Sequence, residues 1–267
     1  MKPYIDLVNR ILTEGEWRAD RTGVGTRAVF GGRIEFDLRE RFPLVTIKET
    51  RWKVAFLEML WFLRGDPDTS YLRQHGSKLW DAWADGKGEL GPIYGVQWRK
   101  WVAFDGDVID QIQDLIDGIK ANPTGRRHLV SAWNVGDLHQ MALPPCHWAF
   151  QVYASNDGHL DMQVNQRSWD VALGAPFNIA QYAFLLHLLA RATGRRVRRL
   201  AFVYGDAHLY TNHVDAMREV IVNWSMDDAP TRLEFNTANT DIDGYSLQDF
   251  SIHDYEHHPH VPLPIAV

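Results

Sequence analysis

Apolar residues recur with helical spacing in four segments of the chain, and this periodicity predicts four helices. Residues 54–63 are apolar on nearly every side, so we expect a buried helix there and another over residues 179–189. Residues 109–119 and 214–224 repeat their apolar positions along one face. These two segments are expected to pack on a core through a single stripe.

Other segments alternate apolar and polar residues, which is typical of β-strands. The expected strands cover residues 33–38, 148–152, 160–164 and about 200–204, and residues 128–133 are strand-like as well. Asn156-Asp157-Gly158 should form a hairpin turn, because these residue types tolerate positive φ. Strands and helices do not alternate regularly, so the pattern favours an α+β fold with a mixed β-sheet and buried helices packed on one face. Residues 225–245 are the least regular stretch.

Composition narrows the class of protein. The chain has 267 residues, of which 45% are hydrophobic, and it has no repeat or linker, so one domain over residues 1–267 is the simplest division. The net charge of −6 leaves no broad basic field for duplex nucleic acid, and any phosphate must be bound locally. No apolar run reaches the roughly 18 residues of a membrane span, and the N-terminus lacks a signal peptide's apolar region, so we expect a cytoplasmic protein.

The single cysteine, Cys146, follows two prolines and precedes the strand that begins near Trp148. A rigid position at the start of a strand suits a nucleophile, and a nearby arginine or histidine would favour the thiolate by lowering its pKa. A lone cysteine is also a common small core residue. The sequence alone leaves both interpretations open.

Glu58 lies in the middle of the most apolar predicted helix, where a carboxylate needs a partner or a function. One interpretation is a structural carboxylate bound by an arginine or a tryptophan N–H. The other is a proton carrier, because burial would raise its pKa.

Several polar groups gather near predicted turns and strand ends. Arg21 lies beside the glycine-rich loop 23–25, which lacks the flanking strand and helix of a dinucleotide site and better suits binding of a small anion. Asn178 is either the N-cap of the helix at 179–189 or a reader of a pyrimidine's donor–acceptor edge. The other candidates are the adjacent pair Arg126 and Arg127, the cluster Arg167, Ser168 and Asp170, and the pair His208 and Tyr210 on one face of a strand. Four histidines between 253 and 260 are interrupted by Pro259, and we expect no metal.

Taken together, these segments resemble the thymidylate synthase family. The matching motifs cover nearly the whole chain: DRTGVGT at 20–26, FPLVT at 42–46, Glu58 with LWFL at 60–63, WDAWA at 80–84, GPIYG at 91–95, Arg126-Arg127, ALPPCH at 142–147, QRS at 166–168, PFNIA at 176–180, DAHLY at 206–210 and PIAV at 264–267.

The resemblance implies an α+β homodimer that converts dUMP to dTMP with 5,10-methylenetetrahydrofolate, through a covalent bond between Cys146 and C6 of the uracil. It implies that the phosphate is bound by Arg21, Arg167 and Ser168 together with the partner's Arg126 and Arg127. Asn178 would bind the uracil edge, and His208 and Tyr210 the deoxyribose. Glu58, Tyr94, His147, Asp170 and Asn178 are the implied catalytic groups beside Cys146. The implied folate contacts are Lys48, Trp80, Trp83, Asp170, Leu173, Gly174, Phe177 and Val267.

Four residues depart from the pattern of that family, namely Glu49, Asn165, Ala172 and Ala175. The smaller or more polar side chains at 165, 172 and 175 would admit water, which keeps a dUMP 5-hydroxymethylase open as an alternative. Glu49 would weaken attraction for a polyglutamate tail. A Cys–His hydrolase using Cys146 with His147 or His208 is a further alternative, although it leaves Glu58, Asn178 and the arginines unexplained.

Overall fold

The computed structural model describes residues 1–224 and 230–266. A six-stranded sheet lies at its centre, in the order β1-β2-β8-β7-β6-β5. The strands are β1 (Glu16–Arg18), β2 (Thr26–Asp37), β5 (Leu129–Ser131), β6 (His147–Ala154), β7 (His159–Asp170) and β8 (Arg196–Tyr210). Strands β7 and β8 are parallel and the other neighbours are antiparallel, so the predicted mixed α+β sheet is confirmed.

All four predicted helices are present, with shifted ends. They are α2 (Trp52–Arg64), α5 (Gln111–Ala121), α6 (Gly174–Ala192) and α7 (Val214–Val222). The predicted turn at 156–158 joins the antiparallel strands β6 and β7, and Gly158 has the positive φ of 82° that the turn requires.

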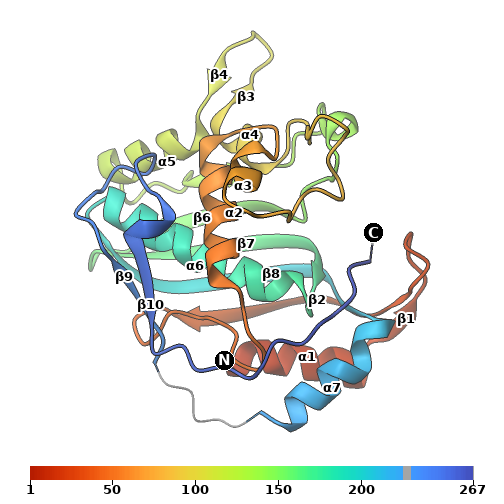
Figure 1. The fold of residues 1–267 in the computed structure, drawn as a ribbon. Helices are drawn as coiled ribbons and strands as arrows, with labels where there is room; N and C mark the ends of the chain where they lie inside the picture. The colour runs from red at the N-terminus through yellow and green to blue at the C-terminus, as the bar shows by residue number, and fades with distance from the viewer. Residues whose placement is uncertain (225–229, 267) are drawn as a thin grey trace.

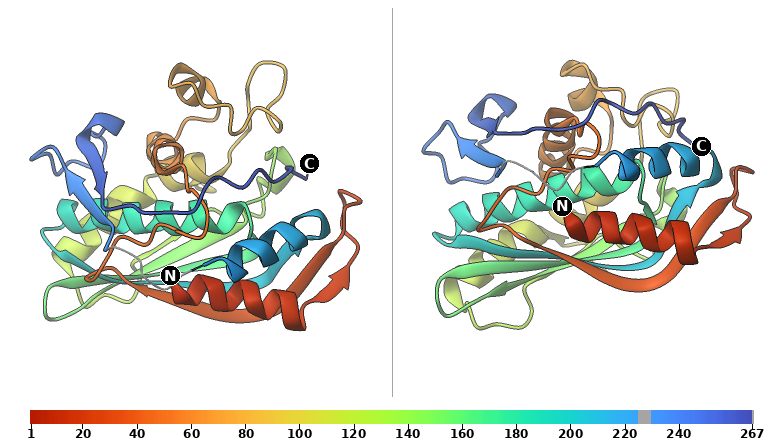
Figure 2. Two further views of the ribbon diagram at one scale, coloured as in Figure 1. Left: turned by 60° about the horizontal axis from the view of Figure 1, so that its bottom comes forward. Right: turned by 90° about the horizontal axis from the view of Figure 1, so that it is seen from below.

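The two most apolar helices form the centre of the core, as predicted. Phe56 of α2 stacks on Phe184 of α6, with ring centroids 4.0 Å apart. Figure 2 shows α1 (Lys2–Glu14), α6 and α7 on the same side of the sheet. This arrangement buries one face of the sheet, with α6 packed on β7 and β8 and α2 packed on α6.

Several elements were not predicted. They include α1, β1, α3 (Ser70–Gln74), α4 (Tyr94–Arg99), the hairpin of β3 (Trp101–Val102) and β4 (Val108–Ile109), and the pair β9 (Arg232–Phe235) and β10 (Phe250–His253). The expectation of irregular structure over 225–245 is therefore wrong at β9, and residues 225–229 lie outside the described part. The pairing of β9 with β10 is long-range, which local periodicity does not reveal.

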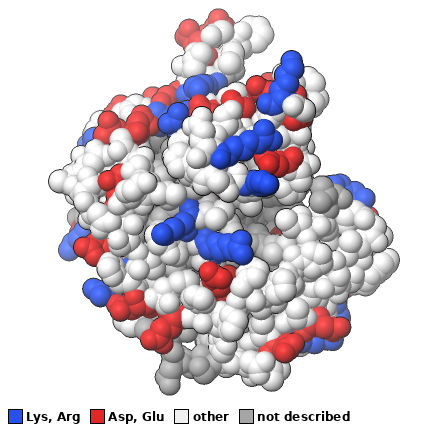
Figure 3. Space-filling model, in the orientation of Figure 1, with Lys and Arg blue, Asp and Glu red and all other residues white. Residues whose placement is uncertain are grey.

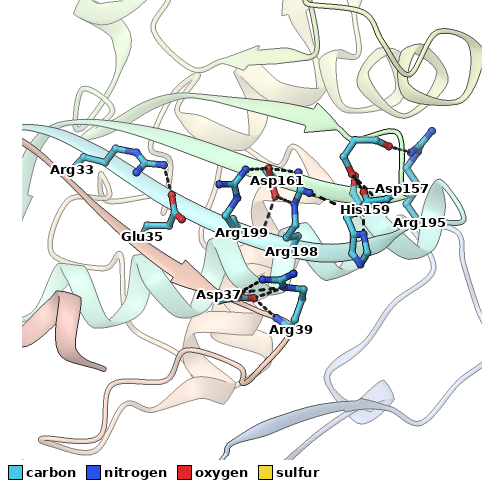
Figure 4. Close-up of polar contacts among 11 residues, drawn as sticks. Arg33, Glu35, Asp37, Arg39, Asp157, His159, Asp161, Arg195, Arg198 and Arg199 are labelled. Carbon is cyan, nitrogen blue, oxygen red and sulfur yellow. Dashed lines mark hydrogen bonds and ion pairs between the residues drawn. The ribbon is translucent and has the colours of Figure 1, made fainter.

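The other face of the sheet carries charged side chains. Figure 4 shows Arg33 with Glu35, and Asp161 with Arg198 and Arg199, in front of the strands and away from α6. Leu129 and Tyr153 on β5 and β6 are 49% and 62% exposed. This face therefore combines paired charges with exposed apolar side chains.

On the face seen in Figure 3, lysine and arginine side chains are interspersed with acidic ones. Among the described residues, no helix has the length and apolar character needed to cross a membrane.

Candidate active site

The cysteine lies where the loop 141–146 enters the sheet. Cys146 directly precedes β6, and its backbone N–H donates to the Tyr94 hydroxyl at 2.8 Å. The Arg167 guanidinium lies 3.9 Å from Sγ and also donates to the carbonyl oxygens of Pro144 and Pro145. Arg167 thus fixes the proline loop and places a positive charge beside the sulfur.

Burial raises the pKa of the Cys146 thiol above its ordinary value, and Arg167 and Arg21 oppose this effect. The arginines thus lower the pKa as expected from sequence, but a net lowering is not observed. The two guanidiniums therefore favour the thiolate, but desolvation outweighs them. The thiol is partly buried rather than an ordinary core residue.

His147 is held in a buried aromatic cluster. Its ring stacks on Tyr94 at 4.1 Å, and its Nδ1 lies 2.7 Å from the Tyr182 hydroxyl. Burial lowers the pKa of His147 to about 3, so the imidazole is neutral at ordinary pH. The hydrogen-bond contact of the Cys146 sulfur within the described residues is with Arg167 rather than with a histidine, since His147 bonds to Tyr182 and His208 to Asp206, so the nucleophile–base pair of a Cys–His hydrolase is not formed.

Glu58 combines both of the interpretations made from sequence. The indole N–H of Trp80 donates to its Oε1 at 2.6 Å, and the Gln181 amide donates to its Oε2. Burial nevertheless raises the pKa of Glu58 to about 7, against the effect of those two bonds. A carboxyl group with partners and a pKa near neutrality can both accept and give a proton at ordinary pH.

Asn178 is not an N-cap, because α6 begins four residues earlier with Leu173 as its N-cap. Its Oδ1 accepts from Gln166 at 2.9 Å and from the indole of Trp169 at 3.1 Å. Its Nδ2 donates to Gln181 at 3.2 Å. Through Gln181, Asn178 is connected to Glu58.

Polar groups also lie at the carboxyl ends of β7 and β8. Ser168 pairs in register with Asp206, and Asp170 with His208. The rings of His208 and Tyr210 are 5.4 Å apart, so these two side chains are neighbours as predicted. Asp20 accepts from the backbone N–H groups of Thr22 and Gly25, which shapes the loop that carries the exposed Arg21. Arg21 lies close enough to act on the pKa values of Cys146 and Tyr210.

Four of the residues expected to contact folate, Asp170, Leu173, Gly174 and Phe177, lie at or just before the start of α6. Asp170 accepts from the backbone N–H groups of Ala172 and Leu173. Lys48 is buried and its pKa is lowered to about 8 by desolvation, with Asp170 acting in the opposite direction. The other expected folate contacts are Leu173, Gly174 and Phe177, which are half-buried, and Trp80 and Trp83, whose rings are 5.7 Å apart. Val267 lies outside the described residues.

Arg126 and Arg127 are not part of this cluster. The carbonyl of His128 accepts from the backbone of Val152, and Leu129 pairs with Gln151, so Arg127 lies beside Tyr153. Cys146 is seven residues away along β6, a span of about 23 Å at strand spacing. Both arginines are exposed at the opposite end of the sheet.

Four supporting residues received no separate prediction from sequence: Gln166, Trp169, Gln181 and Tyr182. Gln181 and Tyr182 lie three and four residues after Asn178 in the same helix. Residues with this spacing share a helix face, so the sequence could have predicted the contact of Gln181 with Asn178. Gln166 and Trp169 reach Asn178 only through tertiary packing. The described residues contain no group of three or more histidine, cysteine or acidic side chains that could hold a metal.

The site thus unites a cysteine beside an arginine, a buried carboxyl group and a network of oriented amides. The model of the protein family described as thymidylate synthase matches residues 2–267. That match covers nearly the whole chain and includes every residue of the site. The chain therefore belongs to the thymidylate synthase family.

Proposed function

We propose that this chain transfers a one-carbon unit from 5,10-methylenetetrahydrofolate to C5 of dUMP and reduces it to a methyl group, with dTMP and dihydrofolate as products. The observation that carries the proposal is the joint presence of Cys146 beside Arg167 and of Glu58 connected to Asn178 through Gln181. A binding module has no need of a nucleophile and a proton carrier in the same site.

Cys146 is the proposed nucleophile toward C6 of the uracil, because sulfur addition there makes C5 electron-rich. The charges of Arg167 and Arg21 favour the thiolate that must form. The Tyr94 hydroxyl, which accepts from the backbone N–H of Cys146, is proposed to take part in removing the C5 proton. His147 holds this arrangement as a neutral hydrogen-bonding group.

Glu58 is the proposed proton carrier at O4 and at the folate nitrogen, since its pKa of about 7 makes both protonation states available. Asn178 is proposed to bind the uracil edge, with His208 and Tyr210 holding the deoxyribose. His208 and Tyr210 both lie at the carboxyl end of β8, where His208 pairs in register with Asp170.

The nucleotide phosphate is proposed to bind Arg21, Arg167 and Ser168, together with Arg126 and Arg127 of a second copy. The span of about 23 Å within one chain supports donation across a homodimer. The exposed Leu129 and Tyr153 beside Arg127 suit an interface on the outer face of the sheet. No nucleic-acid duplex or membrane partner is proposed.

Mixed dimers test this donation. Cys146→Ser and Arg127→Ala chains, each inactive alone, should regain about a quarter of wild-type activity after random mixing, because half of the dimers then hold one intact site. Absence of recovery, with mixed dimers verified by mass, contradicts donation across the interface.

The residues present fit a folate. The buried indole N–H of Trp83 has no hydrogen-bond partner among the described residues, and Leu173 and Phe177 offer half-buried apolar surface. Lys48 and Asp170 would hold its polar groups, and Gly174 lets its ring approach the start of α6. When bound, the folate supplies the carbon and the hydride, and the chain's own residues position it and exclude water.

A second candidate product is 5-hydroxymethyl-dUMP, formed when water rather than hydride completes the reaction and tetrahydrofolate is released. The small side chains of Ala172 and Ala175, both fully buried beside Leu173 and Gly174, favour it. Asn165 and Glu49 are the other two residues that depart from the family's pattern. Asn165 donates to the carbonyl of Ala149 at 3.5 Å, and Glu49, which directly follows Lys48 in the chain, is partly buried.

The two products are distinguished by incubating the protein with dUMP and 5,10-methylenetetrahydrofolate. We expect a nucleotide of the mass of dTMP and the absorbance of dihydrofolate. A nucleotide heavier by one oxygen, without dihydrofolate, would assign the hydroxymethylase instead.

A further inference from the structure

The amide of Asn178 belongs to a chain of hydrogen bonds that begins and ends on an indole. Trp169 donates to Asn178, Asn178 donates to Gln181, Gln181 donates to Glu58, and Trp80 donates to the other carboxyl oxygen of Glu58. Trp169 and Gln181 are each 1% exposed, Glu58 and Trp80 are also buried, and Asn178 is half-buried.

An amide can reverse its donor and acceptor ends by rotating through 180°, but an indole cannot, because its N–H only donates. Gln166 also donates to Asn178, yet its own Oε1 is buried without a partner, so this amide can turn over at little cost. A protonated Glu58 could likewise donate to a reversed Gln181. Trp169 is the member of the chain that forbids such a concerted reversal.

The direction of the chain determines what Asn178 can offer to a ligand. Both lone pairs of its Oδ1 are taken, by Gln166 at 2.9 Å and Trp169 at 3.1 Å. One N–H of Nδ2 is taken by Gln181 at 3.2 Å. The Asn178 amide is therefore left with one free hydrogen-bonding group, the second N–H of Nδ2, which can only donate.

We propose that Trp169 and Gln181 are positioning residues that lock the Asn178 amide as a donor, and thereby make the site specific for a pyrimidine with a carbonyl at C4. This inference rests on the proposed function and names the residues that enforce its substrate choice. A uracil O4 accepts the free N–H. A cytosine presents its own N–H at the same position, so donor meets donor and one group stays unsatisfied.

Trp169→Phe tests the lock, because it removes the indole N–H and retains an aromatic ring for stacking on Phe202, whose ring centroid is 5.0 Å away. The readout is the ratio of dissociation constants of dCMP to dUMP, measured by calorimetry. A purely structural loss would weaken both nucleotides equally and leave this ratio unchanged. We expect the ratio to fall about five- to tenfold, the value of one neutral hydrogen bond.

Trp98→Phe is the matched control. Trp98 is a fully buried tryptophan whose N–H has no hydrogen-bond partner among the described residues, so it does not donate to Asn178. Its substitution should leave the ratio unchanged. A Trp169→Phe protein with the wild-type ratio within twofold overturns the inference.

Gln181→Leu keeps the inference testable if Trp169→Phe does not fold, because it removes the acceptor that holds the other end of the amide. The ratio should then fall about threefold, and an unchanged ratio contradicts the lock. Wild-type protein that binds neither nucleotide would refute the proposed function itself. Wild-type preference for dUMP with no change in either variant would refute only the lock.

Discussion

The Trp80→Phe substitution should make the stability of the protein more sensitive to pH. Burial gives Glu58 a pKa of about 7 in place of its usual 4.5. Ionising it therefore costs the folded state about 3 kcal/mol relative to the unfolded chain. Between pH 4.5 and 7 the folded state binds more protons than the unfolded one, so the free energy of unfolding falls as pH rises through this window.

The indole N–H of Trp80 limits that cost, because it donates to Glu58 at 2.6 Å. A hydrogen bond to a charged group is worth about 1–2 kcal/mol more than one to a neutral group. Phenylalanine keeps an aromatic ring beside Trp61, Trp83 and Tyr94 but cannot donate. We therefore expect the pKa of Glu58 to rise by about one further unit.

Urea unfolding at pH 6 and pH 9, at one fixed protein concentration, measures this effect. Trp80→Phe should lose about 1–2 kcal/mol more unfolding free energy at pH 9 than at pH 6, relative to wild type. Trp98→Phe, which removes an indole N–H without a described partner, should show the same difference from wild type at both pH values. An equal loss at both pH values for Trp80→Phe would refute the electrostatic reasoning.

Three further predictions concern the same site. Tyr182→Phe leaves Nδ1 of the buried His147 without its partner and should lower the unfolding free energy by about 1–3 kcal/mol in urea titrations, whereas a neutral effect would mean that water replaces the hydroxyl. Arg167→Ala removes the charge that favours the Cys146 thiolate, so the pH midpoint of iodoacetamide labelling should move upward; an unchanged midpoint would contradict this role. Gly95→Ala places a Cβ 2.3 Å from a backbone oxygen of α2 and should destabilise the protein by about 1–3 kcal/mol by thermal unfolding, and wild-type stability would show that α4 can shift freely.

The central helices were predictable because their burial is expressed in local periodicity. Phe56 and Phe184 lie in apolar segments that predict burial regardless of partner. Helix α1 was not predicted, although its buried positions Tyr4, Leu7, Val8 and Ile11 have helical spacing. The periodicity there is as clear as in α5, so the sequence does carry the signal for this helix.

The active-site residues were predictable in kind but not in environment. The position of Glu58 in an apolar helix pointed to a raised pKa, and the structure agrees. The pKa of Cys146 moves opposite to expectation, because sequence shows the arginines but not the depth of burial. Trp169 meets Asn178 only through the packing of β7 on α6, so no spacing rule could have paired them.

The proposed reaction requires a covalent bond between Cys146 and C6 of a uracil nucleotide in a folate-dependent transfer. Its most direct test is mass spectrometry of the protein after incubation with 5-fluoro-dUMP and 5,10-methylenetetrahydrofolate. We predict one stable adduct per active site that carries both compounds, located on the peptide containing Cys146 and absent from Cys146→Ser. An unmodified Cys146 in protein that binds both compounds would contradict the account.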